Sequence, residues 1–277
     1  MQFDPSMSII TPVTQLLGIN HPILLAPMAY VADGRLVAAV DAAGGFGILG
    51  GGYGEEKWLL RELDLLDRSK ARFGVGFITW RLAKQPRLLD LVLERRPAAV
   101  MLSVGTQAPF IDRIKRTAAI VICQVQSVAR AKEAVAAGAE ILVAQGAEAG
   151  GHGVTRGLVS LVPEIVDALG GRKPVVAAGG IADGRGLAAA LMLGAAGVLM
   201  GTRFYATQEA AAAQGAKERI RETTGDDTLR RVLPHTAVIA GEAVGLIHDI
   251  PSAQDVIERV VREASALITQ WPSKTPA

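Results

Sequence analysis

The chain has 277 residues, of which 50% are hydrophobic and one is a cysteine, so it can bury a large core but cannot form a disulfide framework. Its formal net charge is only +2 and no basic block alternates with aromatic residues, which argues against nucleic acid as a partner. The first residues lack the features of a signal peptide and no apolar stretch reaches about 18 residues, so a cytoplasmic protein without a membrane span is expected.

Eight short apolar runs with β-branched character recur along the sequence, and helical composition follows them. The runs cover residues 23–26, 46–49, 73–77, 98–102, 121–125, 141–144, 174–177 and 197–200. Short continuous runs of this kind are typical of strands that are buried on both faces. Cys123 lies within the fifth run and is expected to be a buried core thiol.

The segments between these runs have the composition of helices, most of them about ten residues long. They cover residues 35–43, 55–68, 86–94, 109–117, 127–137, 161–169 and 184–193. Ser127, Asp183 and Pro109 are capping or helix-opening residues at their starts. Gly138 and Gly194 stand where a helix C-terminus favours glycine.

The alternation of strands and helices predicts a parallel sheet of the α/β class. Eight such units predict a closed (β/α)8 TIM barrel, with residues 1–277 as a single domain. An open doubly wound sheet is the alternative. The glycine cluster GGGYG at 50–54 weakens it, because the GxGxxG spacing and the later acidic residue of a dinucleotide fold are missing.

The regular alternation ends after residue 200. Residues 206–231 are rich in alanine and charge and are expected to be helical, and residues 210–213 have helical composition, whereas residues 233–245 look irregular. We therefore expect a small C-terminal helical addition, with a helical or irregular insertion at 207–242 near the active-site mouth. An amphipathic pattern at 255–270 predicts a closing helix.

In a TIM barrel the active site lies at the carboxyl ends of the strands, in the loops that follow them. The loops after the seventh and eighth strands contain Gly179, Gly180, Gly201 and Thr202. Their backbone N–H groups and the Thr202 hydroxyl predict a phosphate site, with Arg203 as a further candidate nearby. The alternative is that these glycines only form tight turns.

Two glutamines, Gln124 and Gln145, stand at the mouth ends of the fifth and sixth strands. A buried amide without a hydrogen-bond partner costs about 1–3 kcal/mol, so each needs a partner. A heteroaromatic ligand with donors and acceptors at its edge would supply one, and so would the other glutamine or the neighbouring backbone. Ala26, Pro27 and Met28, after the first strand, can lie against the flat face of such a ligand.

The stretch at 143–157, VAQGAEAGGHGVTRG, follows the sixth strand and concentrates glycines around one histidine, His152. Glycine lets backbone approach a ligand closely, and an imidazole changes protonation near neutral pH. His152 is therefore the candidate acid or base, although a linker with a solvated histidine is the alternative for this stretch in isolation. Glu148 either orients His152 or is a solvated carboxylate. No histidine pairs with cysteine or carboxylate at metal-ligand spacing, so no metal site is expected.

Several strings together resemble the nitronate monooxygenase family, formerly called 2-nitropropane dioxygenases, whose members are FMN enzymes on a TIM barrel. The strings are APMAYVADG (26–34), GGFGILGGGY (44–53), CQVQSV (123–128), VAQGAEAGGHG (143–153), AAGGIADGRGLAAALMLGA (177–195) and VLMGTRF (198–204). The resemblance covers most of the chain and weakens beyond about Thr207.

The resemblance implies an FMN site built from several strand ends. Its residues here are Ala26, Pro27, Met28, Gln124, Gln145, Gly150, Gly179, Gly180, Met200, Gly201 and Thr202. It also implies that His152 is the catalytic residue, which abstracts the α-proton of a neutral nitroalkane or interacts with the nitronate anion. Molecular oxygen then completes an oxidative denitrification to a carbonyl compound and nitrite.

One cofactor position departs from the family pattern. Members commonly read GVNF after the third strand, where this chain has Gly76 within GVGF. The asparagine amide that contacts the flavin in the family is therefore replaced by Gly76.

Two related groups of enzymes share almost the same sequence motifs, namely FMN-dependent enoyl-acyl-carrier-protein reductases and NADH:quinone reductases. NAD(P)H-dependent reduction of a quinone or an enoyl-acyl-carrier-protein is therefore an alternative function, although MGTRF and AQG favour the nitronate enzymes. A protein that binds FMN without turnover, or a barrel that binds a phosphorylated metabolite, is another. Trp80, Tyr30 and Tyr205 are candidates for the wall that faces the substrate. The sequence leaves open whether the protein forms a homodimer, because nothing in it identifies an interface.

Overall fold

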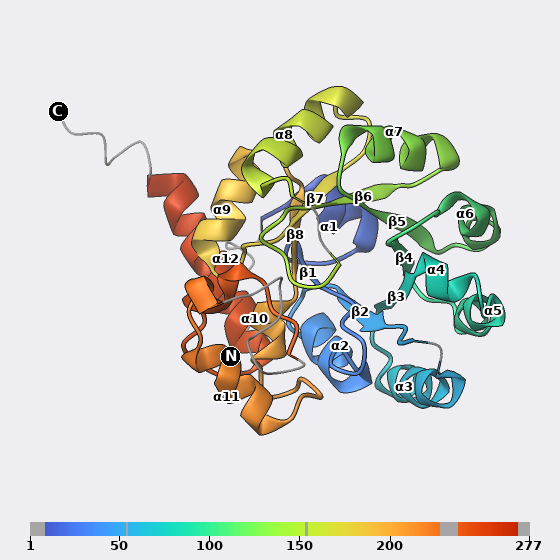
Figure 1. The fold of residues 1–277 in the computed structure, drawn as a ribbon, viewed down its shortest axis with the longest axis horizontal. Helices are drawn as coiled ribbons and strands as arrows, with labels where there is room; N and C mark the ends of the chain where they lie inside the picture. Colours follow the sequence, from blue (N-terminus) through green and yellow to red (C-terminus); the bar gives the residue numbers. More distant parts are fainter. Residues whose placement is uncertain (1–8, 54, 153–154, 228–237, 271–277) are drawn as a thin grey trace.

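The computed structural model describes residues 9–53, 55–152, 155–227 and 238–270. Eight parallel strands form a barrel, and helices surround it (Figure 1). The strands are β1 (Ile23–Leu25), β2 (Gly47–Gly50), β3 (Phe73–Ile78), β4 (Ala99–Ser103), β5 (Ile120–Val125), β6 (Ile141–Gln145), β7 (Val175–Ala178) and β8 (Gly197–Met200). The fold is the predicted (β/α)8 TIM barrel, and every predicted strand is confirmed to within one residue at each end.

The strands pair in parallel in chain order from β2 to β8, and β8 pairs with β1. A bridge between Leu24 and Phe46 joins β1 to the residue before β2. The Leu25 N–H donates to the Phe46 carbonyl (2.9 Å), and the Phe46 N–H donates to the Ile23 carbonyl (3.0 Å). These bonds close the circle of strands, so no long sheet edge is left without a neighbour.

Longer helices follow the strands and cover the outside of the barrel. They are α2 (Gly34–Ala42), α3 (Glu56–Ser69), α5 (Arg87–Glu94), α6 (Ala108–Lys115), α7 (Val128–Ala137), α8 (Leu158–Leu169), α9 (Gly184–Met192) and α12 (Ala253–Gln270). The remaining described helical segments are α1 (Pro12–Leu17), α4 (Thr79–Leu82), α10 (Thr202–Tyr205), α11 (Gln214–Glu222), η2 (Gly225–Asp227) and η3 (Glu242–Leu246). The sequence did not predict α1 or α4.

Local side-chain bonds explain where several helices begin and end. The Ser127 hydroxyl accepts from the Arg130 N–H at the start of α7, and the Asp183 carboxylate accepts from the Gly186 N–H at the start of α9. Gly138 ends α7 with φ of 112°, a conformation that a side chain disfavours. These caps confirm the predicted helix boundaries at Ser127, Asp183 and Gly138.

The hydrophobic residues divide into a core inside the barrel and a core between the strands and the helices. Val143 and Leu199 belong to the inner core. Val13 and Leu17 of α1 join it, and the Thr11 hydroxyl donates to the Ala196 carbonyl just before β8 (2.6 Å). Helix α1 therefore closes the amino end of the barrel, which leaves the carboxyl end for the site.

The expected helix at 210–213 is wrong, because long-range hydrogen bonds hold this segment in another conformation. The Arg35 guanidinium donates to the carbonyls of Gln208 and Glu209, and the Ala211 N–H donates to the Val31 carbonyl (3.1 Å). Helix α11 is the α-helix that the structure describes within the predicted insertion, and residues 228–237 of that insertion lie outside the described residues.

Helix α12 matches the predicted closing helix and packs against α9 and α2 (Figure 1). Cys123 is buried, as expected, and burial raises the pKa of its thiol to about 12. Among the helices of the described ranges, none combines the length and the apolar character that crossing a membrane requires.

Candidate active site

A cavity of about 400 Å³ opens at the carboxyl ends of the strands. Each of the eight strands contributes to its lining, through residues near its carboxyl end or in the loop that follows. The predicted site residues that line it are Ala26, Pro27, Met28, Gly76, Gln124, Gln145, Gly150, His152, Gly179, Gly180, Gly201 and Thr202. The barrel thus brings residues from distant parts of the sequence to one mouth, as the strand-end rule predicts.

Met200 is the predicted cofactor contact that does not line this cavity. Its side chain is 1% exposed and packs in the core between the strands and the helices. Successive side chains of a strand point to opposite faces, so Leu199, which lines the cavity, takes the inward position instead.

Gly179, Gly180, Gly201 and Thr202 form what we call the glycine cup. Gly179 and Gly180 have φ of 120° and 70°, which L-residues with a side chain rarely adopt. A Cβ at Gly179 would also lie 3.0 Å from the Ala149 nitrogen. Both glycines are therefore needed for the backbone path, and their small size leaves N–H groups open to a ligand.

Thr202 completes the cup at the start of the short helix α10. Its Oγ1 accepts a hydrogen bond from the Gly241 N–H (3.0 Å). A hydroxyl can accept and donate at once, so its own proton is left to bind an anion. This bond also ties the C-terminal segment to the cup.

The loop between β6 and α8 is held on two sides. The Glu148 carboxylate accepts from the Leu158 N–H (2.8 and 3.1 Å) at the start of α8, and the Glu148 carbonyl accepts from the Glu242 N–H (2.9 Å). Gly150 and Gly241 pass so closely that a Cβ at Gly150 would lie 3.0 Å from the Gly241 nitrogen. Glu148 is therefore the cap of α8, and neither of the roles considered from the sequence describes it.

Three glutamines form a hydrogen-bonded chain, of which Gln124 and Gln145 line the cavity and Gln126 lies behind them. The Gln124 amide donates to Gln145 Oε1 (2.7 Å), so the two predicted glutamines pair with each other. Gln126 Nε2 donates to the same oxygen (2.5 Å) and to the His152 carbonyl (3.1 Å). Gln145 Nε2 in turn donates to the Gly150 carbonyl (3.4 Å). The chain links β5 and β6 to the loop that carries the histidine.

His152 lies at the mouth with an exposed side chain and lines the cavity. Its backbone is fixed by Gln126, a residue that the sequence alone did not single out. Gln126 stands one residue beyond β5, in CQVQS, and only its partners in space reveal that it supports the histidine loop.

Gly76 and Pro27 pack as a unit on the β1–β3 side of the mouth. A Cβ at Gly76 would overlap the ring carbons of Pro27. An asparagine at this position therefore does not fit while Pro27 holds its place. The departure from the family pattern is matched by local packing, and the surface offered here is an apolar ring.

Tyr30, Tyr53 and Trp58 form what we call the aromatic wall, after β1 and β2. The Tyr30 ring lies edge-on to Trp58 (5.5 Å between centroids) and tilted against Tyr53 (6.4 Å), and both tyrosines line the cavity. Tyr205, another predicted candidate, also lines it, whereas Trp80 does not.

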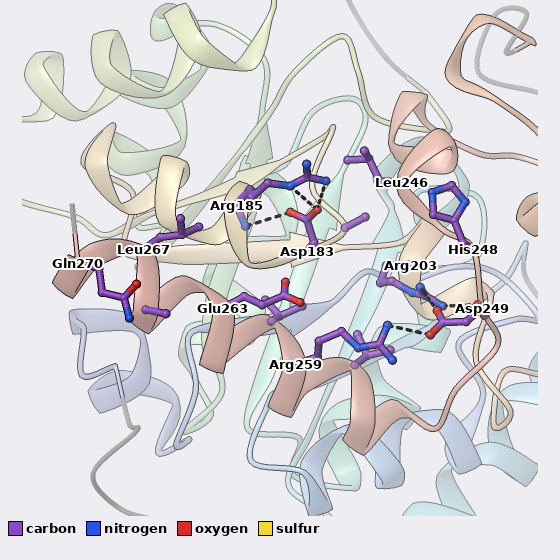
Figure 2. A pocket seen from close by; sticks show the side chains of 14 residues that line it. Asp183, Arg185, Arg203, Leu246, His248, Asp249, Arg259, Glu263, Leu267 and Gln270 are labelled. Carbon is purple, nitrogen blue, oxygen red and sulfur yellow. Dashed lines mark hydrogen bonds and ion pairs between the residues drawn. The ribbon is translucent and has the colours of Figure 1, made fainter. Parts of the chain in front are cut away.

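Arg203 does not join the glycine cup. Its side chain is 5% exposed and lines a second cavity, between α9, α10 and α12, where it bonds Asp249 (2.8 Å) (Figure 2). It also donates to the carbonyls of Ala206 (2.8 Å) and Asp249 (2.7 Å), and Arg259 bonds the other Asp249 oxygen (2.7 Å). Burial lowers the pKa of Arg203, and the Asp249 carboxylate opposes that effect. Arg203 therefore holds the C-terminal segment on the barrel.

The fold and the site together define a TIM-barrel protein with an open cavity at the carboxyl ends of its strands. A family model described as nitronate monooxygenase matches residues 73–233. Nitronate monooxygenases from Neurospora crassa and Pseudomonas aeruginosa are each 37% identical, over 78% and 75% of this chain and 68% and 72% of their own lengths. The chain belongs to the nitronate monooxygenase family.

Other relatives carry different names. A Mycobacterium tuberculosis protein named (3aS,4S,5R,7aS)-5-hydroxy-7a-methyl-1-oxo-octahydro-1H-indene-4-carboxyl-CoA dehydrogenase is 37% identical over 80% of this chain, and the chain spans 63% of that relative's length. Among solved structures, FabK from Thermotoga maritima is similar with a TM-score of 0.88 at 29% identity, covering 97% of this chain and 100% of that one. The family's fold therefore extends over nearly the whole chain.

Proposed function

We propose that the protein is an FMN-dependent oxidoreductase that oxidises alkyl nitronates, with His152 as its catalytic residue. The observation that carries the proposal is the single cavity that joins the glycine cup, the glutamine chain and His152 at the strand ends. Membership of the nitronate monooxygenase family supports the reaction class.

The residues at the mouth fit FMN. The glycine cup offers backbone N–H groups and the Thr202 hydroxyl to a phosphate, and a side chain at Gly179 would crowd Ala149. Pro27 and Met28 offer apolar surface to a flat ring. Gln145 Oε1 already accepts from both Gln124 and Gln126, but the side-chain oxygen of Gln124 and one N–H of each amide stay available to polar ring edges.

The flavin supplies the redox chemistry when it is bound, by accepting electrons from the substrate so that oxygen can complete the oxidation. The protein's part is to bind, orient and handle the proton. His152 stands exposed at the opening of the cavity, where an incoming substrate meets it. One imidazole nitrogen takes the α-proton of a neutral nitroalkane, and the protonated ring stabilises a nitronate anion. Gln126 holds the backbone of His152 in place for this role.

A second candidate is a redox reaction on a thioester or a quinone with NAD(P)H as reductant. Two curated relatives named carboxyl-CoA dehydrogenases, 37% and 36% identical to this chain, favour a thioester as the substrate. Binding of FMN without turnover is the third.

The test is oxygen uptake by FMN-loaded protein with propionate 3-nitronate and short alkyl nitronates, without NAD(P)H. We expect rapid uptake and stoichiometric nitrite. Negligible uptake with every small nitronate contradicts the proposal. In a parallel anaerobic experiment, rapid bleaching of the flavin by NADH or NADPH supports the second candidate, and silence in both assays supports binding without turnover.

A further inference from the structure

The backbone of Tyr30 adopts a conformation that tyrosine disfavours. Its φ is 61°, in the left-handed region. Among the other described non-glycine residues with positive φ, Lys70 and Arg96 stand at helix ends, whereas Val104 lines the cavity as Tyr30 does. Strained residues of this kind persist only where the surroundings hold them, and they concentrate at functional sites.

Tyr30 sits in a tight turn where glycine is the ordinary residue. The Val31 N–H (3.1 Å) and the Ala32 N–H (2.9 Å) both donate to the Met28 carbonyl, and this turn leads from β1 towards α2. A turn with positive φ at this position favours glycine or asparagine, because they have the smallest steric cost. The turn itself therefore gives no reason for a tyrosine at this position.

Contacts on several sides fix the Tyr30 side chain. Its ring packs against Trp58 and Tyr53, and its hydroxyl bonds the Glu55 carboxylate. Glu55 also accepts from the Tyr53 N–H (3.1 Å), and Arg81 bonds the Tyr53 carbonyl. Burial and the Glu55 bond raise the pKa of Tyr30, which keeps the phenol neutral. The ring is thus a rigid surface.

The Tyr30 ring lies in the lining of the strand-end cavity. Tyr30 lines the same cavity as His152 and the glycine cup, and 41% of its surface is exposed, so ring area remains for a ligand to cover. Within the described part of the lining there is no lysine or arginine side chain, and the Glu148 carboxylate is bonded to the Leu158 N–H. A planar apolar group matches this environment better than a charged or small linear group.

We propose that Tyr30 is a specificity-determining residue, whose fixed ring selects substrates that carry a planar apolar body, such as a phenyl ring, next to the reacting carbon. The inference rests on the proposed function for its reaction, but the binding preference itself can be measured without turnover. An offset or edge-on contact between aromatic rings accounts for a preference of about five- to tenfold.

The test compares wild type with Tyr30→Gly and Tyr30→Phe in the FMN-loaded protein. Glycine accepts the φ of 61° and removes the ring, whereas phenylalanine keeps the ring and removes the Glu55 bond. We expect kcat/KM for phenylmethyl nitronate to exceed that for ethyl nitronate in wild type. The ratio should fall about five- to tenfold in Tyr30→Gly and stay within about twofold in Tyr30→Phe. An unchanged ratio in Tyr30→Gly, or a wild-type preference for ethyl nitronate, overturns the inference.

A calorimetric titration with benzamide and acetamide provides a readout that does not depend on the reaction. We expect wild type and Tyr30→Phe to bind benzamide more tightly, and Tyr30→Gly to lose that difference. Discrimination between the amides without turnover of any nitronate contradicts the proposed function and supports the role of Tyr30. Turnover of nitronates without discrimination between the amides supports the proposed function and contradicts the role of Tyr30. Melting temperatures show whether each variant is folded.

Discussion

The two sides of the barrel mouth are built by different means. After β7 and β8 the lining is glycine backbone, with Gly179 and Gly180 at positive φ and Thr202 as the hydroxyl donor. After β1 and β2 the lining is side chains, with the Pro27 ring on Gly76 and Tyr30 in the aromatic wall. A ligand group held by backbone depends on the chain path, whereas a group that meets side chains is selected by their shape.

This difference separates two kinds of variant. We expect substitutions in the glycine cup to change how tightly the protein retains its cofactor. Substitutions in the aromatic wall should change which substrate it prefers. His152 and the glutamine chain lie between the two sides, so their variants should change the rate.

The largest expected effect is at His152. Loss of a positioned acid or base lowers a rate by about 10²- to 10⁴-fold, so we expect His152→Ala to lower kcat at least about 100-fold while FMN stays bound. His248→Ala is the matched control, because His248 is exposed and does not line the strand-end cavity. Steady-state oxygen uptake and the flavin spectrum check both variants. A decrease of less than about threefold in His152→Ala would remove the histidine from the mechanism.

Variants of Arg203 test how much the ion pair with Asp249 stabilises the fold behind the glycine cup. Arg203→Met leaves the carbonyls of Ala206 and Asp249 without their donor, whereas the 41% exposed Asp249 side chain keeps its bond to Arg259. We therefore expect the free energy of unfolding to fall by about 1–3 kcal/mol. Arg259→Met, which removes the 42% exposed partner of the same Asp249, should cost less than about 1 kcal/mol. Denaturant unfolding measures both, and equal losses would contradict the assigned roles.

The stabilisation that the ion pair between Arg203 and Asp249 provides depends on pH. Burial raises the pKa of Asp249, but hydrogen bonds from Arg259 and Arg203 outweigh burial and hold the pKa below its usual value. The ion pair therefore stabilises the fold above the pKa of the unfolded aspartate, and this stabilisation is lost as pH falls through the folded pKa. The stability difference between wild type and Arg203→Met should shrink over the same acidic range.

Gly180 tests the glycine cup itself, with Gly171 as a matched control. Both have φ of 70°, but a Cβ at Gly171 would meet nothing within 4 Å, whereas a Cβ at Gly180 would lie at the cavity, 3.3 Å from the Glu148 Cβ. A left-handed alanine costs about 1–2 kcal/mol, so both alanine variants should lose stability, and Gly180→Ala should lose more because of its contact with Glu148. Only Gly180→Ala should weaken FMN binding, by about tenfold. Equal FMN affinity in the two variants would show that the cup is only a turn.

Gln126 is expected to show the smallest effect. Gln126→Leu removes the donor to the His152 carbonyl, so we expect kcat to fall about fivefold with little change in FMN affinity. Gln107→Leu is the control, since Gln107 bonds the Leu102 and Gln124 carbonyls and does not contact the histidine loop. A pH profile of kcat that shifts in Gln126→Leu alone would show positioning. Matching profiles in both variants would reduce Gln126 to a structural role.

The strands and the glycine cup could be predicted because their signals are local. Each strand is a short apolar run, and the loops after β7 and β8 carry glycines next to it in the sequence. The same reasoning failed at residues 210–213, where the Arg35 guanidinium overrides helical composition from far away in the sequence. Local composition cannot reveal a bond of that kind.

The side-chain half of the mouth was harder to predict for the same reason. Tyr30 could be suspected as an aromatic residue after β1, but its strained turn and its bond to Glu55 depend on the fold. Gln126 contacts residues about 20 positions or more away, and Arg203 turns towards Asp249 and away from the neighbouring cup. Side chains that act through such partners have no signature at their own position.

The proposed function depends first on whether the mouth of the barrel binds FMN. The purified protein, incubated with excess FMN and desalted, should show flavin absorbance and release about one equivalent of FMN per chain when denatured. The released fraction should fall in Gly180→Ala and not in Gly171→Ala. Absence of flavin absorbance after this treatment would contradict the central claim.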